Sequence, residues 1–400
     1  MAKRILILSF YYPPDLSAGS FRTSALVAAL RELRSPGVTF EVITTLPNRY
    51  STFDSKAPEE ETDGPVSICR IKLPRHRSGM LDQAIAFRHF SRAAKRLSRR
   101  GTYDLVFATS SRLMTAALGA QIARELNVPL YLDIRDIFAD TIKDVLPMKL
   151  GFIFEPIISM IERRTIQAAR HVNLVSQGFG AYFLRRYPRQ EYSFYTNGVD
   201  EEFILSADAF ERMATRIHPG PIKVVYAGNI GEGQGLHSII PALARHLRGR
   251  VVFKVIGDGG RKPQLEAALR AADLTDVALA PPVSRAALLQ EYLAADILFL
   301  HLNDHRAFEK VLPSKIFEYA ALGKPIWAGV PGHAATFLRS EVSNVAVFSP
   351  CNVVEALAAF ERLQISTSMR EEFVRKYSRK RIMRLMAQNI MSVIQEGGAL

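Results

Sequence analysis

The chain has 400 residues, 48% of them hydrophobic and 23% charged, so it is long enough for two globular domains and too apolar to be disordered. Its formal net charge of +13 favours anionic partners such as nucleic acid, an acidic membrane surface or phosphorylated ligands. The two cysteines, Cys69 and Cys351, lie far apart, which excludes a disulfide framework and fits a reducing cytosol.

The N-terminus has two basic residues and a short apolar run that stops at Pro13 and Pro14 without a small-residue cleavage site. We therefore interpret residues 4–10 as a strand rather than part of a signal peptide. No apolar stretch reaches the roughly 18–20 uncharged residues of a membrane-spanning helix. The nearest, residues 145–161, contains Lys149 and Glu155.

The first half alternates apolar, β-rich runs with longer segments of helical spacing. The runs predict strands at 4–10, 40–45, 103–110, 129–134 and 171–176, and the segments predict helices at 20–34, 80–100 and 112–126. Near-continuous apolar strands separated by helices indicate a parallel sheet that is covered on both faces.

The second half repeats this pattern. Strands are predicted at 222–229, 251–259, 276–281, 296–302, 325–330 and 345–349, and helices at 236–248, 262–272, 284–295, 314–323 and 352–364. Residues 206–222, with Pro219, Gly220 and Pro221, predict the linker, and residues 368–396 are helical by pattern. Ligands of such α/β sheets bind outside the carboxyl ends of the strands, so the residues that follow each strand are the candidates.

Glycine-rich loops follow three of the predicted strands. A loop through Gly19 leads into a helix that we expect to begin near Ser20, either as an anion site or as a simple turn with a helix cap. The other two loops share one domain, and they carry Gly228, Gly231, Gly233 and Gly235 in the first and Gly257, Asp258, Gly259 and Gly260 in the second. One such loop is usually a turn, whereas two in corresponding places favour a shared ligand.

Residues 311–325 combine a buried helix pattern with charges at its start. We expect Ser314 to cap the helix, and Lys315 in the first turn opposes the helix dipole unless an anion binds there. Glu318, one turn later, could accept hydrogen bonds from two vicinal hydroxyls, as acidic residues do for ribose. The alternative is an exposed Lys–Glu pair worth about 0.2–0.5 kcal/mol, which the apolar flanking residues disfavour.

Six segments together resemble the retaining glycosyltransferases of the GT-B fold, family 4, in order and spacing. They are 9–26, 196–200, 226–236, 255–260, 294–302 and 312–326, and they are most similar to the branch that builds bacterial surface polysaccharides such as O-antigen and capsule. The resemblance implies two doubly wound, Rossmann-like α/β domains that face a central cleft. Residues 1–210 would form the acceptor-side domain, 211–375 the nucleotide-sugar domain, and 376–400 a helix that crosses back to the first domain.

The family implies a hexosyl- or N-acetylhexosaminyltransferase that uses a UDP-sugar and a lipid-linked or oligosaccharide acceptor. In the donor site, Glu318 matches the family's ribose-binding glutamate and Lys315 lies where a phosphate contact is expected. The remaining donor-site candidates are Gly19, Gly228, Asn229, Gln234, Gly257, Asp258, Gly259 and Ser314. The acceptor-side candidates are Asp133, Arg135 and Asp136 in the segment 133–140.

The chain departs from the family pattern at three positions. Lys310 stands where the family has the first of two paired glutamates, and Asn229 and Gln234 stand where many members carry an arginine and a lysine for the diphosphate. We expect Lys310, Lys315 and Arg306 to supply the missing charge, with Lys315, Lys310 and Glu318 as the catalytic residues. No His/Cys ligand cluster and no convincing paired-aspartate motif appears, so we expect no metal and no cofactor, and the donor diphosphate would itself deprotonate the acceptor.

Residues 75–100 are strongly basic, with eight Arg and Lys residues and a single acidic residue, Asp82. A basic amphipathic helix here would attach the protein to the cytoplasmic face of a bacterial inner membrane. The alternative is a helix that covers the sheet with an ordinary charged outer face. Nucleic acid is disfavoured because no recognition motif accompanies the charge.

Two other functions fit the same two-domain scaffold. A UDP-sugar 2-epimerase would bind the same donor and need no acceptor, so formation of an epimer from the donor alone would distinguish it. A non-catalytic nucleotide-sugar-binding protein is the second, because Lys310 and the missing Arg/Lys pair weaken the case for catalysis.

Overall fold

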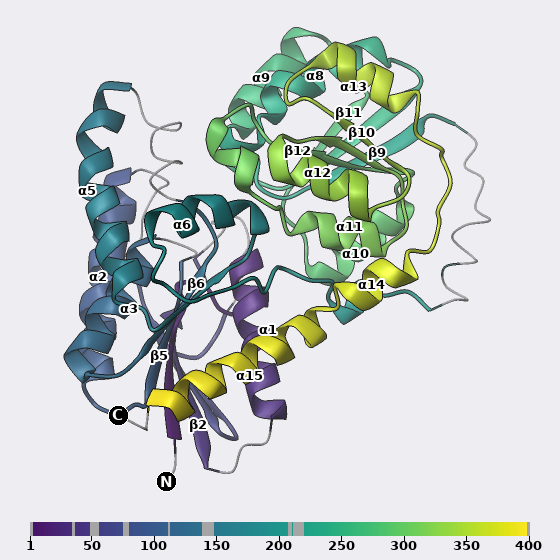
Figure 1. Ribbon diagram of the computed structural model, residues 1–400. Coiled ribbons are helices and arrows are strands. Elements are labelled where there is room, and N and C mark those ends of the chain that lie inside the picture. The colour runs from purple at the N-terminus through teal and green to yellow at the C-terminus, as the bar shows by residue number, and fades with distance from the viewer. Residues whose placement is uncertain are drawn as a thin grey trace. The chain divides into compact units, whose positions relative to one another are not determined.

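The computed structural model describes residues 3–33, 37–48, 56–74, 80–110, 113–137, 148–206, 210 and 220–397. The chain divides into two compact units (Figure 1): unit 1 comprises Met1–Asn197 and Lys380–Leu400, and unit 2 comprises Gly198–Arg379. The boundary lies N-terminal to residue 210, because Val199 and Phe203 are buried in the core of unit 2. Most of the expected linker, 206–222, lies outside the described residues.

Unit 1 is built on one eight-stranded sheet with the order β3-β4-β2-β1-β5-β6-β7-β8. Its strands are β1 Lys3–Leu8, β2 Val38–Thr45, β3 Glu60–Asp63, β4 Val66–Ile71, β5 Leu105–Thr109, β6 Leu130–Ile134, β7 His171–Leu174 and β8 Tyr192–Ser193. All neighbouring strands are parallel except β3, which pairs with β4 antiparallel. The central strands β1 and β5 are almost wholly buried, as a sheet covered on both faces requires.

The helices of unit 1 cover both faces of this sheet (Figure 1). They are α1 Ala18–Glu32, α2 Met80–Ser98, α3 Leu113–Leu126, α5 Met148–Gln167, α6 Gly180–Arg186 and α15 Arg379–Gly397, with the 3-10 helix η1 Gln177–Phe179. Helix α3 packs against both α2 and α5 on one face. Helix α15 buries Met383, Met386 and Ile390, so a segment from the C-terminal part of the chain completes the N-terminal unit.

Unit 2 has a six-stranded, fully parallel sheet with the order β11-β10-β9-β12-β13-β14. Its strands are β9 Ile222–Ala227, β10 Val251–Ile256, β11 Val277–Ala280, β12 Ile297–His301, β13 Ile326–Gly329 and β14 Val345–Phe348. The helices are α8 Leu236–His246, α9 Lys262–Ala271, α10 Arg285–Ala294, α11 Lys315–Ala321, α12 Gly332–Glu341, α13 Val353–Phe360 and α14 Glu371–Lys376, with the 3-10 helices η2 Glu201–Phe203, η3 Glu232–Gln234 and η4 Arg306–Lys310.

Alternate residues of β9 enter two separate cores in unit 2. Val224 and Tyr226 pack in the core that includes α8, α9 and α13, whereas Val225 and Ala227 pack in the core that includes α10, α11 and α12. This alternation follows from the two-residue repeat of a strand. It confirms the predicted doubly wound α/β architecture, in which both faces of a parallel sheet are covered by helices.

Candidate functional site

The loops that follow β9 and β10 are in direct contact at the carboxyl edge of the sheet in unit 2. Gly228 and Gly257 both have positive φ, 143° and 149°. A Cβ added to Gly257 would overlap the Gly228 carbonyl oxygen, and one added to Gly259 would contact the Ile230 carbonyl. The close approach therefore requires glycine at these positions, and the two loops form one surface.

Lys315, the first residue of α11, reaches this surface. Its Nζ lies 3.1 Å from the Tyr226 hydroxyl and 4.4 Å from the centre of the Tyr226 ring. A Cβ added to Gly228 would overlap Nζ, so the ammonium group occupies the space that the glycine leaves open. The structure thus brings Lys315 and Gly228 together from segments far apart in the sequence.

The two polar residues that stand in place of the family's Arg/Lys pair bind each other. Asn229 Nδ2 donates to Gln234 Oε1 at 2.8 Å. Between them, the Glu232 carboxylate pairs with Arg261, and its Oε1 lies 3.8 Å from the His305 Nε2. The loop therefore holds an anion and two amides, and the cation beside it comes from the start of α9.

Asp258 shapes its own loop. One of its carboxylate oxygens accepts a hydrogen bond from the Gly259 N–H at 2.8 Å, and its carbonyl accepts from the Ile230 N–H, also at 2.8 Å. The Asp258 backbone therefore ties the two loops together, and its side chain stabilises the turn of the second loop, so both groups have a structural role without a ligand.

His301 is a buried residue that the sequence reasoning missed. Its Nδ1 lies 2.7 Å from the Gln234 carbonyl, and its Nε2 accepts the Cys351 N–H at 3.0 Å. A carbonyl can only accept, so Nδ1 carries the proton and the ring is neutral. Burial lowers the pKa of the imidazole to about 4. A polar residue at the end of an otherwise apolar strand, "ILFLH", was the signal that could have identified it.

Glu318 lies one turn after Lys315 and is half-buried. Within the described ranges its carboxylate makes no hydrogen bond or ion pair. Burial raises the pKa of the carboxyl above its ordinary value, although the Arg285 guanidinium opposes the rise. A carboxylate held in a partly buried position without a protein partner is available to a ligand with hydroxyl groups.

The other two predicted residues near α11 have different environments. Ser314 already has helical backbone angles and makes no capping hydrogen bond, so the prediction that its side chain caps the helix is wrong. A capping side chain needs an extended backbone at that position. Lys310 is half-buried in η4, which lies beside the Gly233 loop because Phe308 packs against Gly233. Its role, like that of exposed Arg306, stays a prediction.

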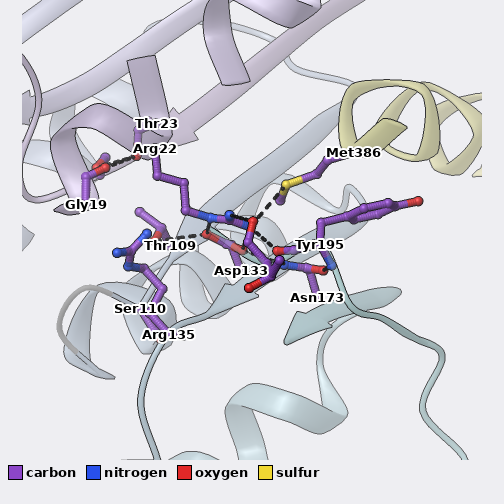
Figure 2. A network of polar contacts seen from close by, with 12 residues as sticks. Gly19, Arg22, Thr23, Thr109, Ser110, Asp133, Arg135, Asn173, Tyr195 and Met386 are labelled. Carbon is purple, nitrogen blue, oxygen red and sulfur yellow. Dashed lines mark hydrogen bonds and ion pairs between the residues drawn. The ribbon is translucent and has the colours of Figure 1, made fainter. Parts of the chain in front are cut away.

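The acceptor-side candidates lie in unit 1, where Asp133, the penultimate residue of β6, forms a buried ion pair (Figure 2). Its two oxygens accept from Arg22 at 2.8 and 2.9 Å, and Oδ1 also accepts from Asn173 at 2.8 Å. Burial opposes its ionisation, but Arg22, together with Arg135 and the Asn173 amide, outweighs that effect and holds the pKa of the carboxyl below its ordinary range. With both oxygens engaged, Asp133 has a structural explanation that needs no acceptor.

Arg22 was missed by the sequence reasoning, and it is the centre of this network (Figure 2). Besides Asp133, it donates to the carbonyls of Tyr195 and Thr196, each at 2.7 Å, and contacts the Met386 sulfur at 3.5 Å. It is 2% exposed. One guanidinium thus joins α1, β6 and α15 within unit 1.

Arg135 and Asp136 follow β6 and are half-buried. The Arg135 N–H donates to the Ser110 hydroxyl at 2.9 Å, and burial raises the pKa of the Asp136 carboxyl to about 6. Residues 138–140 of the expected acceptor segment lie outside the described ranges. Gly19 lies within the first turn of α1, which begins at Ala18 rather than near Ser20, because the Ser17 side chain accepts from the Ser20 N–H.

Among the residues that the structure describes, no group of three or more His, Cys, Asp or Glu side chains could hold a metal ion. Within the same residues, no helix is both long and apolar enough to cross a bilayer.

Comparison with protein families accounts for both units. Residues 22–198 match the family described as glycosyl transferase 4-like domain, and residues 208–381 match glycosyl transferases group 1. The chain belongs to the GT-B glycosyltransferases. The Rossmann-like α/β fold of both units and the enzyme class are therefore confirmed.

Individual relatives of this glycosyltransferase are distant. It is 30% identical over 166 residues to the putative colanic acid biosynthesis glycosyl transferase WcaI of Escherichia coli K12, and the match spans 39% of each chain. Sucrose-phosphate synthase of Thermosynechococcus elongatus has a TM-score of 0.70 at 15% identity, covering 99% of this chain and 94% of the other. WaaG, a glycosyltransferase involved in lipopolysaccharide biosynthesis, has a TM-score of 0.65 at 12% identity, covering 98% of this chain and 98% of the other. HepE of Anabaena in complex with UDP and glucose has a TM-score of 0.61 at 16% identity, covering 98% of this chain and 97% of the other.

Proposed function

We propose that this glycosyltransferase moves a sugar from a UDP-sugar to a lipid-linked or saccharide acceptor in cell-surface polysaccharide synthesis, with retention of anomeric configuration. The observation that carries the proposal is the position of Lys315 against Gly228, one turn before the unpartnered Glu318 carboxylate. The UDP complex of HepE supports the donor class, and WcaI and WaaG support the class of product.

The transfer breaks the bond between the anomeric carbon and the β-phosphate oxygen, and that oxygen leaves with the electron pair as part of UDP. The acceptor hydroxyl oxygen bonds to the same face of the anomeric carbon, and its proton passes to the departing diphosphate. Charge that develops on the leaving group is stabilised by the Lys315 ammonium, with Lys310 and Arg306 as further cations. Glu318 accepts hydrogen bonds from the ribose hydroxyls. Since side chains supply the charge, no metal is required.

The test is transfer from UDP-sugars by wild type and Lys315→Ala. We expect Lys315→Ala to lower kcat by about 100-fold, the effect of losing one charge-stabilising donor. Lys223→Ala is the matched control, because Lys223 is exposed at the opposite end of β9. Near-normal turnover by Lys315→Ala would remove Lys315 from the mechanism. Epimerisation of the UDP-sugar without any acceptor would contradict the proposed transfer itself.

We further propose that α2 docks the enzyme on the inner face of the cytoplasmic membrane. Ala86, Phe90 and Ala94 form its buried stripe. Its outer face exposes Arg88, Arg92 and Arg96, together with Ile85, which is 59% exposed. Residues 75–79 of the basic segment lie outside the described ranges. Arginines beside an exposed apolar side chain suit an anionic bilayer surface.

A further inference from the structure

We propose that Tyr226 is the positioning residue of Lys315: its hydroxyl fixes the ammonium group against Gly228 and ties it to the backbone of residues 228–235, the loop between β9 and α8 that we call the donor loop. The proposal rests on the proposed role of Lys315 in stabilising the departing diphosphate. Tyr226 is the penultimate residue of β9, is 1% exposed, and lies in the core of unit 2.

The hydroxyl of Tyr226 joins two groups of the site. It donates its single proton to the Asn229 carbonyl at 2.7 Å. Its lone pairs are therefore the part that faces the Lys315 Nζ, which donates to the oxygen at 3.1 Å. The loop that follows β9 and the first residue of α11 thus share one oxygen atom.

The ring adds a second hold on the same cation. Nζ lies 4.4 Å from the centre of the Tyr226 ring, within the range of a cation–π contact. A lysine has four rotatable bonds and a point charge, so a single contact would leave the ammonium mobile. Contacts with the oxygen and the ring, together with the space left open by Gly228, restrict it to one place.

This arrangement leaves the ammonium ready for an anion. An ammonium group has three N–H donors, and Tyr226 takes one, so two remain for the oxygens of a diphosphate. A charge that is already in position needs no reorganisation when the leaving group departs, which is the basis of electrostatic catalysis. Loss of the hydroxyl should therefore slow the chemical step more than it weakens substrate binding.

The experiment is a double-mutant cycle with Tyr226→Phe, Lys315→Ala and the double variant. Tyr226→Phe keeps the buried ring and removes only the oxygen, and we expect it to lower kcat by about tenfold, as for one hydrogen bond to a charged group. The double variant should be no slower than Lys315→Ala. Affinity for UDP, measured by calorimetry, should fall in Tyr226→Phe, while affinity for uridine should not.

Tyr192→Phe is the matched control, because the Tyr192 hydroxyl also donates to backbone carbonyls, those of Phe183 and Tyr187, but lies in unit 1. We expect its kcat to equal that of the wild type. If the losses from Tyr226→Phe and Lys315→Ala multiply in the double variant, Tyr226 acts independently of Lys315 and the proposal is overturned.

The outcomes separate this proposal from the proposed function. Full turnover by Lys315→Ala would remove the lysine from the mechanism and Tyr226 with it. If Lys315→Ala has a lowered kcat and Tyr226→Phe has the kcat of the wild type, the Tyr226 proposal alone is overturned. Should Tyr226→Phe not fold, fluorinated tyrosine at residue 226, whose oxygen is a weaker acceptor, is the second variant. An unchanged kcat for it would equally overturn the proposal.

Discussion

His301 must stay neutral for the donor loop to keep its shape. Its Nε2 accepts the Cys351 N–H, and a proton on that nitrogen would place two donors face to face. Its Nδ1–H holds the Gln234 carbonyl, and Gln234 in turn holds Asn229. One buried ring therefore connects the loop after β9, through Gln234, with the loop after β14, through Cys351, at the carboxyl edge of the sheet in unit 2.

The depressed pKa of His301 makes stability depend on pH. The unfolded chain takes up the proton near pH 6.5, whereas the folded imidazole, with a pKa of about 4, does not until pH 4. Stability should therefore fall as the pH drops from 6.5 to 4, by about 3 kcal/mol from this residue. His301→Gln should be less stable than wild type at pH 7, and the gap should narrow by that amount at pH 4. Chemical unfolding at both pH values measures it, and a constant gap would contradict the assignment.

At the scale of single residues, the sequence identified those whose polarity conflicts with an apolar neighbourhood. Lys315 and Glu318 stood out because five apolar residues flank them within α11 and at its end. Arg22 and Asp133 form a bidentate pair although 111 residues separate them in the sequence. The sequence around either residue does not indicate that the other is its partner. Pairing of that kind depends on which strand lies beside which helix, so it emerges only from the folded unit.

At the scale of elements, the contact between the β9 and β10 loops has no room for a side chain. Gly257→Ala would place a methyl group on the Gly228 carbonyl and strain a positive φ. One of the two loops must therefore move, and Lys315 would be displaced with it because its Nζ contacts Gly228. We expect UDP affinity to fall by about tenfold or more, with a loss of about 1–3 kcal/mol in stability. Calorimetry with UDP measures the first effect.

Gly249→Ala is the control for that prediction. Gly249 also has positive φ, 76°, but a Cβ there meets nothing within 4 Å. It lies between α8 and β10, so only the backbone cost should appear and UDP affinity should stay that of the wild type. Equal losses of affinity in both variants would show that backbone strain, rather than contact between the loops, is responsible.

The outer face of α2 should control binding to anionic membranes. Arg88→Glu with Arg92→Glu reverses two exposed charges, each worth about 1 kcal/mol near an anionic surface, so binding should fall at least tenfold. Flotation with vesicles that contain anionic lipid measures this. Arg245→Glu with Arg270→Glu, two exposed arginines of unit 2, is the control with the same change of charge. An equal loss in both would mean that net charge, and not α2, drives binding.

Most strands and helices of unit 2 were predictable, because each buried strand is an apolar run between helical segments. The hairpin of β3 and β4 was missed: β3 is wholly exposed, and β4 alternates buried and half-buried residues, so neither forms an apolar run. Helix α12 was missed because Gly332 and His333 open a short segment without a strong apolar stripe. Helix α5, with Pro156 inside it, was considered only as a membrane span.

At the scale of the whole molecule, α15 belongs to the core of unit 1 although it follows all of unit 2 in the sequence. Met386 is fully buried and contacts Arg22, and the Tyr131 hydroxyl donates to Asn389 at 2.8 Å. Met386→Ala should cost about 2–5 kcal/mol. Hydrogen exchange should accelerate in β5, β6 and β7 and stay unchanged in β9 and β10. Leu243→Ala, a fully buried residue of α8, should give the opposite pattern. Equal acceleration in both units would contradict the division.

The chain leaves unit 1 after Asn197 and re-enters it at Lys380, and the two ends of the intervening segment are adjacent. The Val199 N–H donates to the Tyr377 carbonyl at 2.8 Å, and the Arg379 N–H donates to the Val199 carbonyl at 2.9 Å. Unit 2 is thus one continuous segment that is inserted between the two segments of unit 1. During synthesis, unit 2 has all its residues before unit 1 has α15, so the unit that begins first is completed last. Until α15 has been synthesised, the part of unit 1 that already exists exposes the surface that Met383, Met386 and Ile390 will cover.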